Sequence, residues 1–277
     1  MIAICKQLKL PALGLGVYQV RELDVCEDIV LKALQMGYRL IDTAQSYGNE
    51  EAVGRAIIKS GVPREEIFVT TKLKIANLTY EKAKASFFES LKKLQLKYVD
   101  LLLIHHPYND VYGAWRAMQE LYREGYVRAI GLSNFPPDRL EDMVLHGGEI
   151  PHLMQVEIRP FFQQNKIVEL MNKHRIQAEA WSPLAQGKFD IFKNEILVSL
   201  AQKYGKTPAQ VILRWLYQRN IAIVVKTVRE ERLKENMDIF DFELSQEEMQ
   251  RIASLDRNES VMPQIREPYW IDTLSSF

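Results

Sequence analysis

Two kinds of segment alternate along the chain. Short runs of apolar or β-branched residues indicate buried strands, whereas longer runs with apolar residues every three or four positions indicate amphipathic helices. The predicted strands are Leu13–Tyr18, Arg39–Ala44, Phe68–Lys72, Val99–His105, Ala129–Asn134, Met154–Ile158, Gln177–Ser182 and Ala222–Thr227. The predicted helices between them are Asp24–Met36, Asn49–Lys59, Tyr80–Leu94, Gly113–Arg123, Pro137–Leu145, Gln163–His174, Thr207–Arg219 and Glu230–Asp238.

Local signals mark several helix ends. Gly37 follows the first predicted helix and is a typical helix stop. Thr79 precedes the third helix and can cap its first turn. Thr207 is followed by Pro208, which is the order of a capping residue and a first helical position. These signals agree with the boundaries that the apolar pattern predicts.

Eight strands that alternate with helices favour an α/β fold, a closed (β/α)8 TIM barrel that forms one domain over residues 1–277. Two helices exceed the simple count, Asp190–Tyr204 and Ser245–Leu255, and the C-terminal tail 258–277 is predicted to be irregular. The main alternative is a doubly wound sheet, whose nucleotide fingerprint needs three spaced glycines. Gly14 and Gly16 supply two of them, but Gln19 stands at the third position, so we interpret this pair as a tight turn.

Composition narrows the function classes. The chain has 36 basic and 36 acidic residues, so no basic excess points to nucleic acid or to an anionic membrane. Cys5 and Cys26 are too few for a disulfide framework and fit a reducing compartment. The first residues do not have the pattern of a signal peptide, and no apolar run has the length of a membrane span. We therefore expect a cytoplasmic protein that binds neither nucleic acid nor membranes.

Polar residues stand at the ends of the apolar strands. In a barrel, catalytic groups come from the carboxyl ends of several strands. These ends supply Asp42, Lys72, His105, Asn134, Glu157 and Lys226. Strand ends also simply meet water, which is the plain alternative for any one of these residues.

Asp42, Tyr47, Lys72 and His105 together suggest an acid–base chemistry. A lysine ammonium near a phenol lowers its pKa, a carboxylate can hold the lysine, and a histidine can orient a carbonyl oxygen. The alternative is an Asp42–Lys72 ion pair beside a surface tyrosine. His105 and His106 are adjacent on a predicted strand, so their side chains are expected to point to opposite faces, and no metal site is predicted.

Several segments, in order along the chain, resemble the aldo-keto reductase family. The similarity runs from about residue 8 to about residue 256 and is carried by the segments Leu10–Gly16, Gly37–Ala44, Tyr47–Glu51, Thr70–Lys72, Asp100–His105, Ile130–Phe135, Gln155–Glu157, Trp181–Leu184, Arg232–Asn236 and Phe240–Leu244. The resemblance implies a TIM barrel that reduces carbonyl groups, with Asp42, Tyr47, Lys72 and His105 as the catalytic set. It also implies a small-molecule carbonyl substrate and a monomer.

The resemblance further implies an extended nicotinamide cofactor across the strand ends. Ser133, Asn134 and Gln155 would hold the carboxamide, and Trp181 would stack on the nicotinamide ring, where most members have tyrosine. The other implied cofactor residues are Gly16, Val17, Asp42, Ser182, Leu184, Gln186, Lys226, Thr227, Arg232, Glu235 and Asn236. Lys226 and Arg232 suit the 2′-phosphate dianion of NADPH. Thr227 replaces a usual serine there, and Val225 a usual proline.

Other departures concern the substrate. The implied pocket residues are Tyr18, Tyr47, His105 and His106, of which Tyr18 and His106 stand where the family often has tryptophan. Such a pocket is more polar and hints at small or hydroxylated carbonyl compounds. Arg159 replaces a histidine, with no role assigned. The principal alternative function is an NADP-bound regulatory or binding module without catalysis on the same fold; a hydrolase or isomerase would need an acid–base pair or metal that the sequence does not offer.

Overall fold

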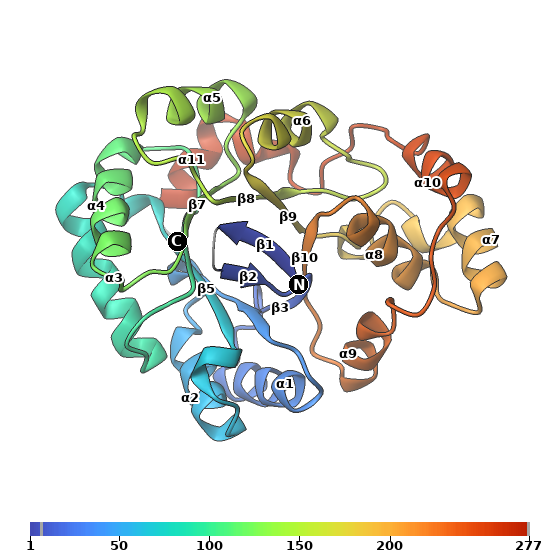
Figure 1. The fold of residues 1–277 in the computed structure, drawn as a ribbon, viewed down its shortest axis with the longest axis horizontal. Coiled ribbons are helices and arrows are strands. Elements are labelled where there is room, and N and C mark those ends of the chain that lie inside the picture. The colour runs from blue at the N-terminus through green and yellow to red at the C-terminus, as the bar shows by residue number, and fades with distance from the viewer. Residues whose placement is uncertain (6–7, 276–277) are drawn as a thin grey trace.

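Eight parallel strands close into a barrel in the computed structural model, which describes residues 1–5 and 8–275 (Figure 1). Neighbouring strands follow the order β10-β3-β4-β5-β6-β7-β8-β9, so each pairs with its neighbour in sequence and β10 closes the ring on β3. The strands are β3 Leu13–Gly16, β4 Leu40–Asp42, β5 Phe68–Leu73, β6 Leu101–Ile104, β7 Ile130–Ser133, β8 Leu153–Glu157, β9 Gln177–Trp181 and β10 Ala222–Val225. The predicted TIM barrel is confirmed.

Helices surround the barrel (Figure 1). They are α1 Leu23–Gln35, α2 Glu50–Ser60, α3 Tyr80–Leu94, α4 Val111–Arg123, α5 Pro137–His146, α6 Asn165–Lys173, α7 Glu195–Tyr204, α8 Pro208–Gln218, α9 Glu230–Met237 and α10 Gln246–Ala253. The predicted caps are present: the Thr79 hydroxyl accepts from the backbone N–H of Lys82, and Thr207 forms a capping box with Gln210. The two additional helices, α7 and α10, are also confirmed.

Strands buried on both faces explain the continuous apolar runs in the sequence. All residues of β6 are buried, because one face packs inside the barrel and the other packs under helices. Gly14 lies within β3, where a Cβ atom would stand 2.3 Å from Cγ of Leu40. The interpretation of Gly14 and Gly16 as a tight turn is therefore wrong: both are strand residues, and Gly14 permits close packing against Leu40.

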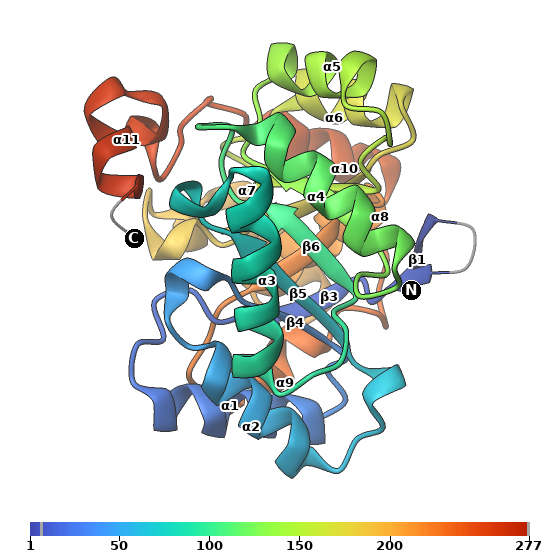
Figure 2. The same ribbon diagram turned by 90° about the vertical axis from the view of Figure 1, so that its left-hand side faces the viewer.

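A hairpin that the apolar pattern did not predict covers the amino-terminal end of the barrel. It consists of β1 Ile2–Cys5 and β2 Leu8–Leu10, which pair antiparallel with Ile2 opposite Leu10. Leu10 packs in one buried cluster with Leu40, Leu101 and other leucines of the strands. Figure 2 shows this hairpin and the C-terminal helix α11 at opposite ends of the barrel.

The C-terminal tail is more ordered than predicted. Instead of an irregular segment, it contains the 3-10 helix η6 Pro263–Arg266 and the helix α11 Pro268–Ser275. Each begins at a proline, a residue that favours the first helical position. α11 packs against the short helix η3 Ile75–Asn77, which follows β5 at the carboxyl end of the barrel. The expectation of an irregular tail is wrong here, because a short segment of low helical signal is stabilised by tertiary packing.

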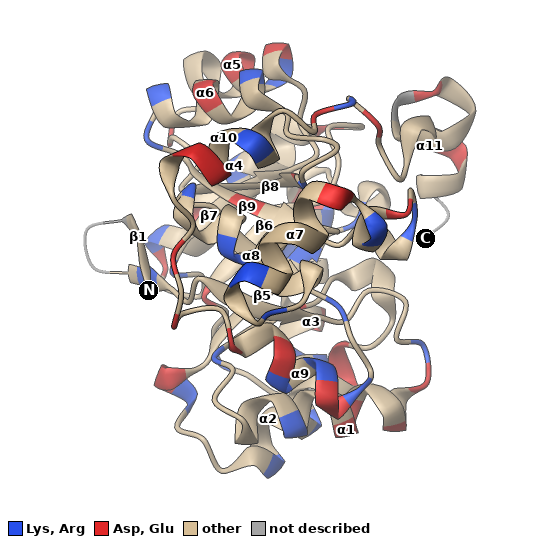
Figure 3. Cartoon of the chain, turned by 90° about the vertical axis from the view of Figure 1, so that its right-hand side faces the viewer, with Lys and Arg blue, Asp and Glu red and all other residues tan. Residues whose placement is uncertain are grey.

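Acidic and basic residues are interspersed over the outer helices. Figure 3 shows both signs on α9 and α10, in agreement with the balanced composition. Among the described residues, no helix is long and apolar enough to cross a membrane.

Candidate active site

A cavity of about 910 Å³ opens at the carboxyl ends of the barrel strands. Its walls come from strand ends, from the loops that follow them and from the C-terminal tail. Most residues that the sequence analysis singled out line it: Gly16, Tyr18, Asp42, Tyr47, His105, His106, Ser133, Asn134, Gln155, Trp181, Ser182, Leu184, Gln186, Lys226, Thr227 and Arg232. The structure thus brings together residues that are up to about two hundred positions apart in sequence.

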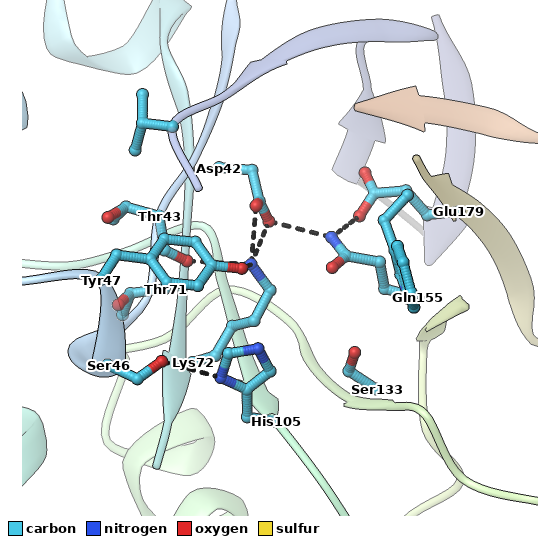
Figure 4. Close-up of polar contacts among 12 residues, drawn as sticks. Asp42, Thr43, Ser46, Tyr47, Thr71, Lys72, His105, Ser133, Gln155 and Glu179 are labelled. Atoms are coloured by element: carbon cyan, nitrogen blue, oxygen red, sulfur yellow. Dashed lines mark hydrogen bonds and ion pairs between the residues drawn. The ribbon is translucent and has the colours of Figure 1, made fainter. Parts of the chain in front are cut away.

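Asp42 and Lys72 form a buried ion pair at the base of the cavity (Figure 4). The Lys72 Nζ lies 2.6 Å and 2.7 Å from the two carboxylate oxygens of Asp42 and donates to the Thr43 carbonyl at 3.0 Å. The lysine side chain is 0% exposed and the aspartate side chain 5%. Burial alone would lower the pKa of Lys72, but Asp42 and Tyr47 raise it above its ordinary value, so the ammonium form is stable.

Tyr47 connects this pair to the cavity. It lies in the 3-10 helix η1 Gln45–Tyr47, and its hydroxyl is 3.4 Å from the Lys72 Nζ. Burial raises the pKa of Tyr47 to about 12, while the charge of Lys72 acts in the opposite direction. The predicted effect of Lys72 is present, but the predicted net lowering of the pKa is wrong, since loss of solvation of the phenolate outweighs it. The phenol therefore keeps its proton at neutral pH.

His105 and His106 do not point to opposite faces. Strand β6 ends at Ile104, so the alternation of a strand no longer applies, and the two rings stack with centroids 4.6 Å apart. Burial lowers the pKa of His105 well below its usual range and that of His106 to about 4. Both rings are neutral at neutral pH. The Ser46 hydroxyl lies 3.3 Å from Nδ1 of His105; when it donates there, the ring proton is on Nε2.

Gln155 extends the network through a residue that the sequence analysis missed. Its Nε2 donates to Asp42 Oδ2 at 2.9 Å and to Glu179 Oε2 at 2.7 Å (Figure 4). Glu179 is fully buried on β9, and burial, with Asp42 nearby, raises its pKa to about 8. A glutamate within an apolar strand was the available signal. Because both amide hydrogens are engaged, the orientation of Gln155 is fixed, and its Oε1 is the atom that can accept from a ligand.

Asn134 and Trp181 are held against each other. The Asn134 Nδ2 donates to the His105 carbonyl and to the Ser133 hydroxyl oxygen, both at 3.0 Å, and its Oδ1 accepts from the Trp181 indole at 2.9 Å. These bonds fix the plane of the indole, which lines the cavity. They also leave the Ser133 hydroxyl able to donate.

Two further parts of the cavity suit anionic groups. Ser182, Ala185 and Gln186 have positive φ angles of 51°, 54° and 54°, and the Ser182 hydroxyl oxygen is buried without a partner. Lys226 and Arg232 are exposed, as is Arg229, a cavity residue that the sequence analysis missed. Within the part of the chain that the structure describes, none of these three cations forms an ion pair.

Other residues that the resemblance implied lie outside the cavity wall. Val17 is fully buried, and its carbonyl accepts from Asn49. Glu235 accepts from the Thr207 hydroxyl at 2.6 Å, which joins α9 to the start of α8. Asn236 is buried, with Tyr38 as a neighbour. Among residues 1–5 and 8–275, no group of three His, Cys, Asp or Glu side chains could hold a metal ion.

The closed barrel and the buried lysine–aspartate pair beside a tyrosine define a TIM-barrel enzyme whose reaction site lies at the carboxyl ends of the strands. Comparison with known proteins makes this specific. The chain matches the Aldo/keto reductase family over residues 12–257 and belongs to that family. It is accordingly an oxidoreductase that acts on carbonyl groups with a nicotinamide cofactor, as the resemblance implied.

Individual relatives cover nearly the whole chain. The glyoxal reductase of Bacillus subtilis (strain 168) is 45% identical over 257 residues, which are 92% of each protein. The methylglyoxal reductase DkgA of Escherichia coli (strain K12) is 42% identical over 257 residues, again 92% of each. Among solved structures, an aldo-keto reductase of Bombyx mori in complex with NADP is 32% identical, with a TM-score of 0.88 and coverage of 95% of this chain and 94% of that one.

Proposed function

We propose that this protein reduces small aldehydes and ketones with NADPH and that Tyr47 donates the proton. The proposal rests on two linked contacts at the base of the cavity: the buried Lys72 ammonium group contacts the Tyr47 hydroxyl on one side and the Asp42 carboxylate on the other. The reduced nicotinamide, when bound, supplies the hydride that adds to the carbonyl carbon. The roles of the chain's own residues follow from their protonation states.

Tyr47 carries its proton at neutral pH and can release it only when a stronger base forms nearby. The oxygen of a carbonyl group becomes such a base as negative charge develops on it. Lys72, 3.4 Å from the phenol, then stabilises the phenolate, and Asp42 keeps Lys72 in place. His105 is neutral, and its Nε2–H can donate to the same oxygen and orient it.

The cavity residues fit a nicotinamide dinucleotide. The Ser133 hydroxyl can donate to the carboxamide oxygen, while Oε1 of Gln155 and Oδ1 of Asn134 can accept from its NH2 group. The fixed indole of Trp181 offers a face for stacking on the nicotinamide ring. The segment 182–187, with the unpartnered Ser182 hydroxyl, suits the pyrophosphate. Gly16, Leu184 and Gln186 complete this wall of the cavity.

Lys226, Arg232 and Arg229 favour NADPH over NADH. Cations without ion-pair partners suit the 2′-phosphate, which NADH lacks, and Thr227 lies beside them. Arg229 adds a third cation to the two that the sequence analysis proposed. Val17, Glu235 and Asn236 do not line this cavity, so we assign them to supporting the strand and helix that carry the contact residues.

The substrate is a small dicarbonyl or similar aldehyde. This class is suggested by the names of the Bacillus subtilis and Escherichia coli relatives and by the polar character of the pocket residues Tyr18, Tyr47, His105 and His106. Tyr18 packs against Tyr47 with ring centroids 5.1 Å apart. We further infer one domain, which the continuous closed barrel supports, and a cytoplasmic location, which the buried, unpaired Cys26 fits. A monomer is proposed on the family resemblance alone.

Replacement of Tyr47 by phenylalanine tests the proposal. The variant should lose about 100-fold or more in kcat, because general acid catalysis contributes at least that much. NADPH affinity should change by less than about twofold, since the hydroxyl is not among the groups assigned to the cofactor. Turnover is followed by NADPH absorbance with glyoxal and methylglyoxal, and binding by fluorescence titration. Undiminished turnover would refute the role of Tyr47; a wild-type protein that binds NADPH but reduces no carbonyl would favour a regulatory module.

A further inference from the structure

A buried ion pair lies at the end of β8, away from the catalytic network. Arg159 Nη1 donates to Glu157 Oε1, and the side chains are 0% and 5% exposed, respectively. The guanidinium lies over two aromatic rings, 5.7 Å from the centroid of Phe162 and 5.4 Å from that of Phe189. A buried pair of this kind is stable only when additional hydrogen bonds satisfy both partners.

The C-terminal tail, a hundred residues further along the chain, supplies such bonds to both partners, while Nε of Arg159 is buried without a hydrogen bond. Arg159 Nη2 donates to the carbonyl of Glu259. Glu157 accepts from the Ser260 hydroxyl at 2.6 Å and from the backbone N–H of Val261 at 2.7 Å. We call Glu157, Arg159 and residues 259–261 the tail anchor. Nearby, the backbone N–H groups of residues 257 and 259 both donate to the Phe161 carbonyl at 3.1 Å.

The residues that follow the tail anchor form one wall of the cavity. Met262 comes directly after it, and Ile265, Trp270, Thr273 and Leu274 follow on η6 and α11. The tail also contacts the loop after β6, where the Tyr108 hydroxyl donates to the Ile265 carbonyl at 2.8 Å, and α11 packs against η3. The residues proposed to hold the cofactor come instead from β3, from β7 to β10 with the loops after them, and from α9.

We propose that Glu157 and Arg159 are positioning residues for substrate specificity, because they fix the tail that closes the substrate end of the cavity. Neither side chain lines the cavity, so the pair acts only through the segment that it holds. Residue 262 is adjacent to the anchor, and a displacement of residues 259–261 therefore moves the cavity wall directly. The inference rests on the proposed function for the identity of the substrate, but the attachment of the tail can be measured without it.

Replacement of Arg159 by methionine is the primary test. Methionine keeps apolar bulk beside the two rings but removes the donors to Glu157 and to the tail. KM for methylglyoxal should rise about 10-fold or more, since each lost bond to a charged group weakens attachment of the wall substantially. The value of kcat should stay within about threefold, because contacts with the wall are made equally in the ground and transition states. NADPH affinity should stay within about twofold of wild type.

Arg257 offers a matched control. It lies on the same segment, with its guanidinium 4.1 Å from the Phe161 ring centroid, but its side chain is 48% exposed. It forms an ion pair at 3.9 Å with the exposed side chain of Glu259, and an exposed pair of this kind contributes little to stability. Arg257→Met should leave KM unchanged. Ser260→Ala removes the hydroxyl that donates to Glu157 and accepts from the backbone N–H of Met262 at 3.0 Å. It should raise KM by about threefold, so the proposal remains testable if Arg159→Met does not fold.

Hydrogen exchange provides a readout that does not depend on activity. In Arg159→Met, backbone amides of residues 260–275 should exchange faster by about 10-fold or more, with no change in β5 or β7. If the wild-type enzyme reduces no carbonyl, the proposed function fails, while this exchange result still decides the role of the anchor. Unchanged exchange in the tail, or a KM effect of equal size in Arg257→Met, would overturn the proposal.

Discussion

The Asp42–Lys72 pair allows stability and catalysis to be separated by a double-mutant cycle. Lys72→Met removes the only cation that contacts Asp42 among the described residues, and leaves Gln155 as the donor to its carboxylate. Removing one partner of a buried pair destabilises a protein by about 3–5 kcal/mol. The buried carboxylate can escape this state by taking up a proton, which costs about 4 kcal/mol at pH 7 for a carboxyl group of ordinary acidity. The destabilisation expected from breaking the pair and the free energy of protonating the carboxyl group are therefore of the same size.

The double variant Asp42→Asn/Lys72→Met should recover most of this loss. Asparagine is uncharged and its oxygen can still accept from Gln155, so no isolated charge remains. We expect a free energy of unfolding within about 1–2 kcal/mol of wild type, and thus a double variant that is about 2–3 kcal/mol more stable than Lys72→Met. Activity should be absent in both variants, because the ammonium beside Tyr47 is missing. The double variant would therefore be stable and inactive.

Urea unfolding followed by tryptophan fluorescence measures the cycle. The loss in the single variant should also shrink by about 1.4 kcal/mol for each unit by which the pH is lowered from 7, because the variant must protonate a carboxylate to fold. A double variant as unstable as the sum of its two single variants would refute the reasoning. So would a loss in Lys72→Met that does not depend on pH.

Two further outcomes concern the cofactor and the network below it. Arg232→Ala should weaken NADPH binding about 10-fold to 100-fold while leaving NADH binding within about twofold, as measured by fluorescence titration. Equal losses of affinity for both cofactors would contradict the assignment of Arg232 to the 2′-phosphate. Glu179 keeps its proton up to about pH 8 in the folded protein but loses it near its ordinary pKa in the unfolded chain. As the pH rises from about 5 to about 8, wild-type stability should therefore fall relative to that of Glu179→Gln, as measured by urea unfolding at several pH values. Parallel curves of unfolding free energy against pH would argue against a buried protonated carboxyl.

The barrel could be predicted from the sequence because its signals are strong and repeated. Apolar runs such as Leu101–Ile104 are buried on both faces, which is the condition that a parallel barrel imposes. The same geometry places Asp42 and Lys72 on adjacent strands, with Asp42 opposite Thr70 in the register, so their contact follows from the topology. The residue types at strand ends then indicated the chemistry.

The parts that were not predicted depend on tertiary contacts. The hairpin β1–β2 and the helix α11 are short, and packing against the ends of the barrel stabilises them. The stacking of His105 on His106 depends on where β6 ends, which the pattern placed one residue too late. Glu179 and Arg229 belong to an apolar strand and to a loop, and only the fold shows that they reach the site.

The protonation states of the site argue for Tyr47 as the proton donor over its neighbours. His105 is neutral across the neutral range, because burial and the nearby Lys72 disfavour its charged form, so it can orient an oxygen but has no readily released proton. Lys72 is held by Asp42 and the Thr43 carbonyl, and losing its proton would leave the Asp42 carboxylate buried without a cation. The Tyr47 phenol alone has a proton whose release places a negative charge next to an ammonium group. Burial holds the pKa of Tyr47 high, so the phenol keeps its proton until the substrate oxygen becomes basic, and the charge of Lys72 offsets part of this burial effect.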